Sequence, residues 1–189
     1  MTNQTISHAQ VKEICDDVSY LQDEAEALKY LIDRVPYDEQ PPEGHSIINT
    51  LRLIDFSQQY YYRPAIQNTL SDNRPVKLNE FEDPETGFDA MLKDAANESA
   101  DIQKVLNKII KHRAALLNII DKISLFEWEK NLIAKNKREI LLFDFVSEMI
   151  RKERGYLKKV ADLILLYQNE KEQQREIQKR SSNKNFNHS

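Results

Sequence analysis

Apolar residues recur at alternating spacings of three and four over residues 8–35, without a slip. This spacing places them on one narrow stripe of an α-helix, of the kind that faces partner helices in a bundle. The segment VPYDEQPPEG, residues 35–44, ends the helix because its three prolines cannot continue it. The stripe consists of Val11, Ile14, Val18, Leu21, Ala25, Leu28, Ile32 and Val35.

A second helical pattern starts behind Ser46, a favourable N-cap residue, and continues to Pro64, which we expect to kink or end it. Residues 68–87 follow with turn-forming residues and prolines and with no periodicity. They predict a long loop between the second and third helices. Such a loop is uncommon inside a compact domain and often lies near a site.

A third helical pattern covers about residues 88–123, with a slip near His112 and Arg113. The sequence SLFE, residues 124–127, is a capping box that opens a short extra helix through about Ala134. No strand pattern of convincing length is present, so we expect no sheet.

The fourth long helix starts near Lys137 and loses its apolar character beyond Tyr167. Four long amphipathic helices, joined in part by long connections, predict an all-α four-helix bundle over residues 1–167. The polar residues 168–189 predict a helical extension that frays into a disordered tail.

The apolar stripe of the fourth helix is interrupted between Ile150 and Leu157. Lys152, Glu153 and Tyr156 stand where the stripe would continue. In four-helix bundles, binding and metal sites are built from inward side chains on facing helices. Positions 152 and 156 are one helical turn apart, so their side chains can point at one spot.

Three segments carry a resemblance to a known family. HSIINTLRLID (residues 45–55) opens the second helix, ISLFEWEKNL (123–132) holds the break before the short helix, and KERGYLKKV (152–160) lies in the fourth helix. With the order and length of the elements over residues 8–166, they resemble the DinB-like superfamily of bacterial four-helix bundles. This superfamily includes the YfiT-type metal-dependent enzymes. The resemblance implies a DinB-like bundle and aligns the family's metal-ligating histidines with positions 53, 152 and 156.

All three of these positions hold other residues, namely Leu53, Lys152 and Tyr156. A leucine cannot coordinate a metal, a protonated lysine repels a cation, and tyrosine ligation is rare. We therefore expect a degenerate site with no metal and no cofactor. The resemblance also places His45 where the family has a tryptophan, at the mouth of the second helix.

Two interpretations of the interrupted stripe stay open. In the first, Lys152 and Tyr156 fill a polar cavity in which a carboxylate neutralises the ammonium group. In the second, Lys152 and Glu153 face solvent and only Tyr156 packs inward, since long lysine side chains reach water easily. The candidate residues for lining such a pocket are His45, Asp55, Glu148 and Met149, with Asp55 or Glu148 as the carboxylate.

The segment QQYYYRP, residues 58–64, places Tyr60, Tyr61 and Tyr62 in succession. Successive residues on a helix point about 100° apart, so one monomer core cannot bury all three rings. One or two rings can pack in the bundle, and tyrosine is enriched in interface cores. We expect these tyrosines to contribute to an interface with a second copy of the chain or with a ligand. We expect a homodimer, formed through the tyrosines or through the first and fourth helices.

The 189-residue chain is 40% apolar and 31% charged, which fits one domain of exposed helices. Its single cysteine, Cys15, excludes an intrachain disulfide, and the neighbouring Asp16 and Asp17 disfavour a thiolate nucleophile. Neither a signal-like segment nor an apolar run long enough to span a bilayer is visible. We expect a cytoplasmic protein without a membrane partner.

The charge is distributed unevenly along the chain. Residues 1–100 carry 8 Lys/Arg against 19 Asp/Glu, whereas residues 101–189 carry 19 against 12. An acidic and a basic half that pack together explain this distribution. A nucleic-acid surface would instead favour clustered arginines with interleaved aromatic residues, which the basic half lacks. We expect no nucleic-acid partner.

These patterns favour a metal-free bundle that binds a small ligand or a protein partner. The alternative is an enzyme that keeps a hydrolase or thiol-transferase activity of the DinB-like family in an altered site. The identities of residues 53, 152 and 156 distinguish the two hypotheses and favour the first.

Overall fold

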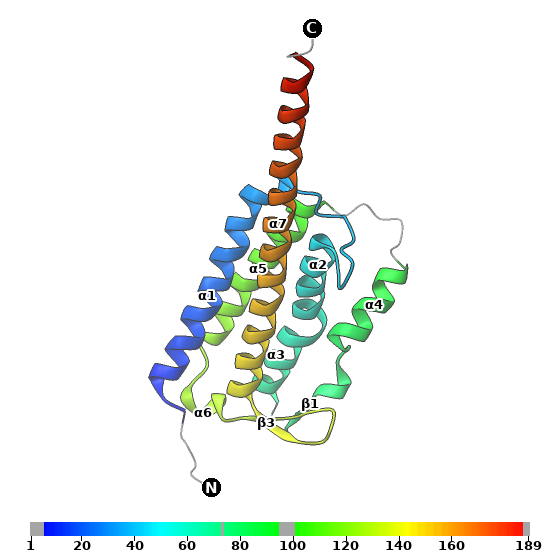
Figure 1. The fold of residues 1–189 in the computed structure, drawn as a ribbon. Coiled ribbons are helices and arrows are strands. Elements are labelled where there is room, and N and C mark those ends of the chain that lie inside the picture. Colours follow the sequence, from blue (N-terminus) through cyan, green and yellow to red (C-terminus); the bar gives the residue numbers. More distant parts are fainter. Residues whose placement is uncertain (1–5, 73, 95–100, 187–189) are drawn as a thin grey trace.

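The computed structural model describes residues 6–72, 74–94 and 101–186. Its four long helices are α1 (His8–Leu31), α2 (Ile47–Ser57), α5 (Ile102–Ile120) and α7 (Leu142–Phe186). Helix α1 packs on α5 and α7, and α2 packs on the same two helices, so the four form a closed bundle (Figure 1). The four-helix bundle predicted from the sequence is confirmed.

The helices have an up-down-down-up arrangement. Helices α1 and α7 run in the same direction, and α2 and α5 run in the opposite direction (Figure 1). Asp17, in the first half of α1, pairs with Arg154 in the first third of α7. Gln58, which directly follows α2, bonds to Glu153 on the same part of α7. The centre of the bundle therefore lies where these three helices and α5 face one another.

Short elements connect the long helices. They are η1 (Ile32–Arg34), the π-helical segment η2 (Gln58–Tyr62), α3 (Arg63–Ser71), β1 (Val76–Lys77), η3 (Leu78–Glu80), α4 (Pro84–Asp94), α6 (Leu125–Trp128), β2 (Asn131–Ile133) and β3 (Glu139–Leu141).

Serine caps fix several helix starts as the sequence predicts. The Ser46 side chain accepts a hydrogen bond from the Asn49 backbone at the start of α2. Ser124 and Glu127 form the expected reciprocal capping box of α6. These bonds satisfy backbone N–H groups that a helix start otherwise leaves without a partner.

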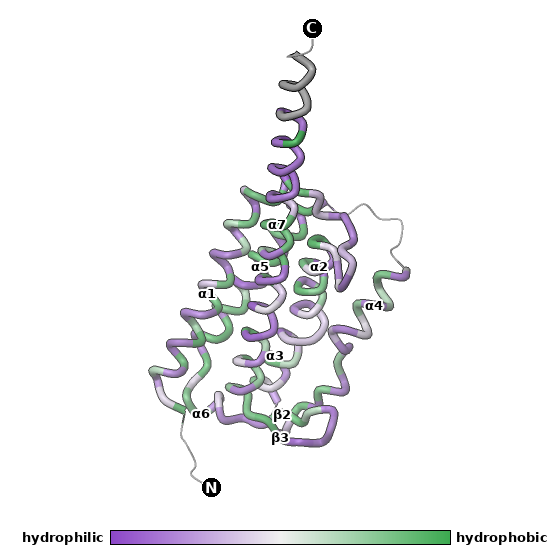
Figure 2. Tube along the Cα trace, in the orientation of Figure 1, coloured by the Kyte–Doolittle hydropathy of each residue, from purple (hydrophilic) through white to green (hydrophobic). Residues whose placement is uncertain are grey.

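The core follows the predicted stripe of α1. Its buried members are Ile14, Val18, Leu21, Ala25 and Leu28. Figure 2 shows hydrophobic positions distributed along all four bundled helices, and mostly hydrophilic positions along the end of α7 that projects beyond them. The extension is helical to Phe186, and residues 187–189 lie outside the described part of the chain.

Of the two expectations for Pro64, a kink or an end of the second helix, the end is wrong. The chain stays helical through η2 and α3 to Ser71, because Pro64 occupies the first turn of α3, where a missing N–H group costs little. The predicted loop over 68–87 is correspondingly shorter, since α3 covers its beginning and α4 starts at Pro84.

The expectation of no sheet is also wrong. Strand β1 pairs in parallel with β2, with Val76 opposite Leu132, and β2 pairs antiparallel with β3, with Leu132 opposite Ile140. Each strand has only two or three residues, too few to produce a period of two in the sequence. The hairpin between β2 and β3 turns at Lys137, whose φ of 66° is incompatible with the predicted helix start.

The third predicted helix, 88–123, is two helices in the described structure. Helix α4 is described to Asp94 and packs on α2, and α5 begins at Ile102 behind the N-cap residue Asp101. Residues 95–100 lie outside the described part of the chain. The predicted short helix ends at Trp128 rather than Ala134. Within the described ranges, no helix combines the length and apolar character that crossing a bilayer requires.

Candidate functional site

A cleft of about 610 Å³ lies between α7 and the start of α2, together with the loop before it. Along α7 it is lined by Tyr156, Lys159, Asp162, Leu163 and Leu166. The opposite wall consists of Glu43, Gly44, His45, Thr50 and Leu53. The cleft thus brings together Leu53 and Tyr156, two of the three positions where the family resemblance implies metal ligands.

The inner end of the cleft is apolar and aromatic. Leu53 is buried in a small cluster with Phe56 and Phe88, and Tyr156 packs against this cluster. The His45 ring stands edge-on to Phe88, with 5.7 Å between ring centroids. His45 therefore packs at the entry to α2, which fits its predicted position.

The phenol of Tyr156 stays protonated in this environment. Burial is the main cause that raises its pKa, and the negative charges of Glu85 and Glu153 add to the effect. A protonated phenol donates a hydrogen bond and is a poor metal ligand. Tyr156 is consequently a polar group that can orient a ligand in the cleft.

The observed positions of Lys152 and Glu153 do not fully match either sequence interpretation. Lys152 is exposed, so it does not fill a polar cavity, while Glu153 is 1% exposed, so it does not face solvent. The exposure of Lys152 and the inward packing of the partly buried Tyr156 agree with the second interpretation, and the burial of Glu153 does not. The interruption of the stripe therefore marks a buried carboxylate rather than a buried ammonium group.

Glu153 belongs to a buried polar layer that joins three helices one turn from Tyr156. Its carboxylate forms an ion pair with Arg113 of α5, which is 0% exposed. The amide nitrogen Nε2 of Gln58, in η2, donates to Glu153 Oε1 at 2.7 Å and contacts Met149 Sδ at 3.1 Å. Burial raises the pKa of Glu153, and the charge of Arg113 opposes this shift.

Helix α1 also reaches toward this layer through Glu24. Its Oε2 atom is buried and has no hydrogen-bond partner among the described residues. Burial raises the pKa of Glu24, against the opposing charges of Arg154 and Arg113. Three further buried atoms of this layer have no hydrogen-bond partner among the described residues. They are Gln58 Oε1 and the Arg113 nitrogens Nε and Nη2.

Gln58 is positioned by an irregular helical turn. The N–H group of Arg63 bonds to the Gln58 carbonyl, five residues earlier, as in a π-helix. π-Helical turns occur frequently at functional sites. No direct sequence signal marks this turn, apart from the proline that follows it.

Asp55 and Glu148, the two predicted partners for Lys152, pair with other residues. Asp55 Oδ1 lies 2.8 Å from His112 Nε2, and its Oδ2 lies 3.6 Å from Lys108 Nζ. Glu148 accepts two hydrogen bonds from Arg151, which lower the pKa of its carboxyl. Among the predicted pocket residues, His45 lines the cleft and Met149 belongs to the buried polar layer.

The three tyrosines occupy three different environments. Tyr62 is 4% exposed and Tyr60 is 45% exposed. Tyr61 is partly buried and packs on Tyr62, with both rings against Phe145. Tyr60 thus remains as the one member of this trio with a largely accessible ring.

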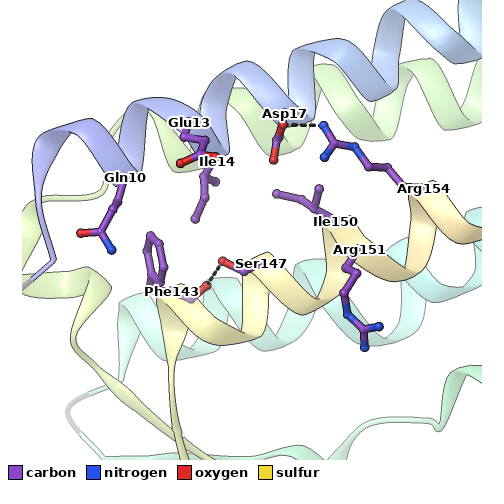
Figure 3. Close-up of a pocket in the computed structure, with 9 residues that line it drawn as sticks. All are labelled: Gln10, Glu13, Ile14, Asp17, Phe143, Ser147, Ile150, Arg151 and Arg154. Atoms are coloured by element: carbon purple, nitrogen blue, oxygen red, sulfur yellow. Dashed lines mark hydrogen bonds and ion pairs between the residues drawn. The ribbon is translucent and has the colours of Figure 1, made fainter. Parts of the chain in front are cut away.

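A second, smaller cleft of about 330 Å³ lies between α1 and α7. Figure 3 shows Phe143, Ile14 and Ile150 between the two helices, and Arg154 paired with Asp17 across the gap. Arg151, the other arginine of this cleft, pairs with Glu148. Because both arginines already have carboxylate partners, this cleft offers fewer free polar groups than the cleft beside α2.

The residues at positions 53, 152 and 156 do not fit a divalent metal. Leu53 has no donor atom, Lys152 is exposed, and Tyr156 holds a protonated phenol. Over the described ranges, no group of three or more His, Cys, Asp and Glu side chains could hold a metal ion. Cys15 is a poor candidate nucleophile, because burial and Asp121 raise its pKa to about 11.

No protein-family model matches the chain, and no curated protein is significantly similar to it in sequence. Its fold is similar to that of YfiT from Bacillus subtilis, described as a probable metal-dependent hydrolase with an unusual four-helix bundle topology. The TM-score is 0.70, over 86% of this chain and 90% of that chain, at 11% sequence identity. The likeness confirms the four-helix-bundle fold that the sequence predicted, and it is a likeness of fold alone.

Proposed function

We propose that this bundle is a metal-free binding protein that holds a small molecule in the cleft between α2 and α7. The observation that carries the proposal is that Leu53 and Tyr156 line one cleft of about 610 Å³. Small-molecule sites typically enclose about 300–1,000 Å³. They are mostly apolar, with a few polar groups that orient the ligand. Leu53, Leu163 and Leu166 supply the apolar surface, and Tyr156 and Lys159 supply polar groups.

The buried polar layer supports a metal-free site. Glu153 is the carboxylate closest in sequence to Tyr156 on the inward face of α7, and it already has an ion-pair partner in Arg113 and a hydrogen-bond donor in Gln58. A metal ion would have to replace both contacts. The guanidinium of Arg113 thus supplies the positive charge that this carboxylate requires.

Two neighbouring leucines of α7 provide a matched test of the cleft. Leu166 lines it and is 48% exposed, whereas Leu165 is 58% exposed and does not line it. A fragment library screened by native mass spectrometry should yield ligands of the wild-type protein. Leu166→Trp should abolish their binding by filling the cleft, and Leu165→Trp should leave it unchanged. Ligands that survive Leu166→Trp, or the absence of any ligand, would refute the proposal.

The alternative function is a metal-dependent hydrolase or thiol transferase with an altered site. The likeness of the fold to YfiT favours it. Elemental analysis of protein purified without chelator separates the two hypotheses, because stoichiometric zinc, nickel or iron would support the enzyme. If the alignment of the three positions is correct, the combined substitution Leu53→His, Lys152→His and Tyr156→His should create nickel binding. A folded variant that binds no nickel would refute the alignment.

We also propose that the protein is a cytoplasmic homodimer without nucleic-acid or membrane partners, with a bundle over residues 1–167 and an appended helix beyond it. The accessible ring of Tyr60 and the projecting end of α7 support self-association. Light scattering coupled to gel filtration should give twice the monomer mass, and Tyr60→Ser should lower it. A monomer at micromolar concentration would refute the homodimer.

A further inference from the structure

We propose that the ligand of the α2–α7 cleft is an amphiphile with an extended apolar body and one carboxylate, which Lys159 binds. This inference rests on the proposed binding function and specifies the chemical class of the ligand.

The shape of the cleft indicates an extended apolar body. Its α7 wall runs from Tyr156 to Leu166, ten residues that correspond to about 15 Å of helix. Leu163 and Leu166 follow one another along this wall, and Leu53 faces the inner end from α2. A linear hydrocarbon chain would contact all three leucines, and burying its methylene groups favours binding.

The Tyr156 end of the α7 wall offers a hydrogen-bond donor and, three residues on, the positive charge of Lys159. The Lys159 ammonium lies 5.8 Å from the centre of the Tyr156 ring and forms no ion pair with any described residue. The Tyr156 phenol stays protonated and can donate a second hydrogen bond to the same group. A carboxylate accepts from both donors, which makes it the best match for this end.

The two acidic residues of the cleft, Asp162 and Glu43, are poorer partners for the head group of a ligand. Asp162 is neutralised by Lys158, whose Nζ lies 2.7 Å from Asp162 Oδ2. Glu43 is exposed in the loop before α2, next to Gly44. A cationic head group would have to displace Lys158 from Asp162 or bind the exposed Glu43, so an alkylamine is the competing ligand in the test.

The test compares three ligands of equal chain length by isothermal titration calorimetry on the full chain: decanoate, decylamine and decanol, each below its micelle concentration. Decanoate should bind most tightly. Lys159→Met removes the charge and keeps an apolar stem, and it should weaken decanoate binding about tenfold, the loss expected for one charged hydrogen bond. Decanol binding should not change. Lys152→Met alters an equally exposed lysine of α7 outside the cleft and serves as the control.

Each outcome separates this inference from the proposed function. Decylamine binding as tight as decanoate binding, or unchanged decanoate affinity in Lys159→Met, would overturn the carboxylate assignment and leave a binding cleft. Failure of all three ligands to bind would also overturn it. The proposed function itself fails only if the fragment screen finds no ligand whose binding Leu166→Trp abolishes.

Discussion

Arg113 of α5 and Glu153 of α7 form an ion pair that is almost completely shielded from water. Each residue interrupts the apolar stripe of its own helix, and the two interruptions meet at the centre of the bundle. Gln58 completes the arrangement by donating to the second carboxylate oxygen. The polar layer therefore connects α2, α5 and α7 beside the inner end of the cleft.

Removing one partner of the buried pair should destabilise the bundle strongly. We expect Arg113→Met to lower the free energy of unfolding by about 3–5 kcal/mol, because Glu153 is then buried without its counter-ion. The double variant Arg113→Met, Glu153→Met should recover most of that loss, since two apolar side chains leave no uncompensated charge. Urea denaturation followed by circular dichroism measures both effects, and equal stability of the single variant and wild type would contradict the assignment.

The hydrogen bond from Gln58 should contribute less than the ion pair. Gln58→Leu leaves Glu153 Oε1 without its donor, so we expect a loss of about 1–3 kcal/mol. Gln59 is the next residue in the same π-helical segment and is exposed, so Gln59→Leu provides a matched control with little effect. Thermal unfolding of both variants tests this difference. If Gln58→Leu and Gln59→Leu have similar melting temperatures, the hydrogen bond from Gln58 does not contribute to stability.

The two helical glycines should respond in opposite directions to alanine. At Gly87 a Cβ atom would lie 3.0 Å from Phe56 Cζ and 2.6 Å from Glu82 Cγ, so Gly87→Ala should destabilise the packing of α4 by about 1–3 kcal/mol. At Gly155 a Cβ atom would have no neighbour within 4 Å. Gly155→Ala should therefore stabilise α7 by about 0.5–1 kcal/mol. Denaturation midpoints of the two variants must move to opposite sides of wild type.

Acid should weaken the contact between α4 and the hairpin of β2 and β3. The ion pair with Lys135 is the main cause that lowers the pKa of Asp83 from 3.8 to about 2. A lowered pKa in the folded state gives stability that is present above pH 3.8 and is lost as the pH falls toward 2. Asp83 Oδ1 also accepts from the backbone N–H groups of Glu85 and Thr86, and an asparagine oxygen can do the same. Wild type should thus lose more stability over this range than Asp83→Asn.

The control for this acid effect is Asp89→Asn, which removes an exposed carboxylate from the same helix. It should keep the pH dependence of wild type. If melting temperatures of wild type and Asp83→Asn fall in parallel from pH 4 to pH 2, the ion pair with Lys135 makes no net contribution.

The long helices could be predicted because their sequences repeat a simple pattern. Two local signals are not overridden by tertiary contacts. They are the apolar stripe from Val11 to Val35, which spans α1 and η1, and the caps at Ser46 and Ser124. The short strands could not be predicted in the same way. Strands of two or three residues depend on pairing across the chain, as Val76 with Leu132 shows.

The site was predicted in part. Leu53 and Tyr156 line a common cleft, as the family resemblance implied, but Lys152 does not line it. The slip at Arg113 and the gap at Glu153 were both visible in the sequence. The ion pair between them could not be predicted. A helical period indicates on which face of its helix a residue lies, but it does not indicate which charged residues of different helices are in contact.

The shared burial of Arg113 and Glu153 also constrains how this sequence can diverge. A substitution at only one of these two positions leaves the other residue as a buried charge without a counter-ion. Selection should remove such a destabilised variant before a second substitution arises. Substitutions at 113 and 153 are then expected to occur together across homologous genes, as two opposite charges or as two apolar residues. The residue types at positions 113 and 153 should therefore covary.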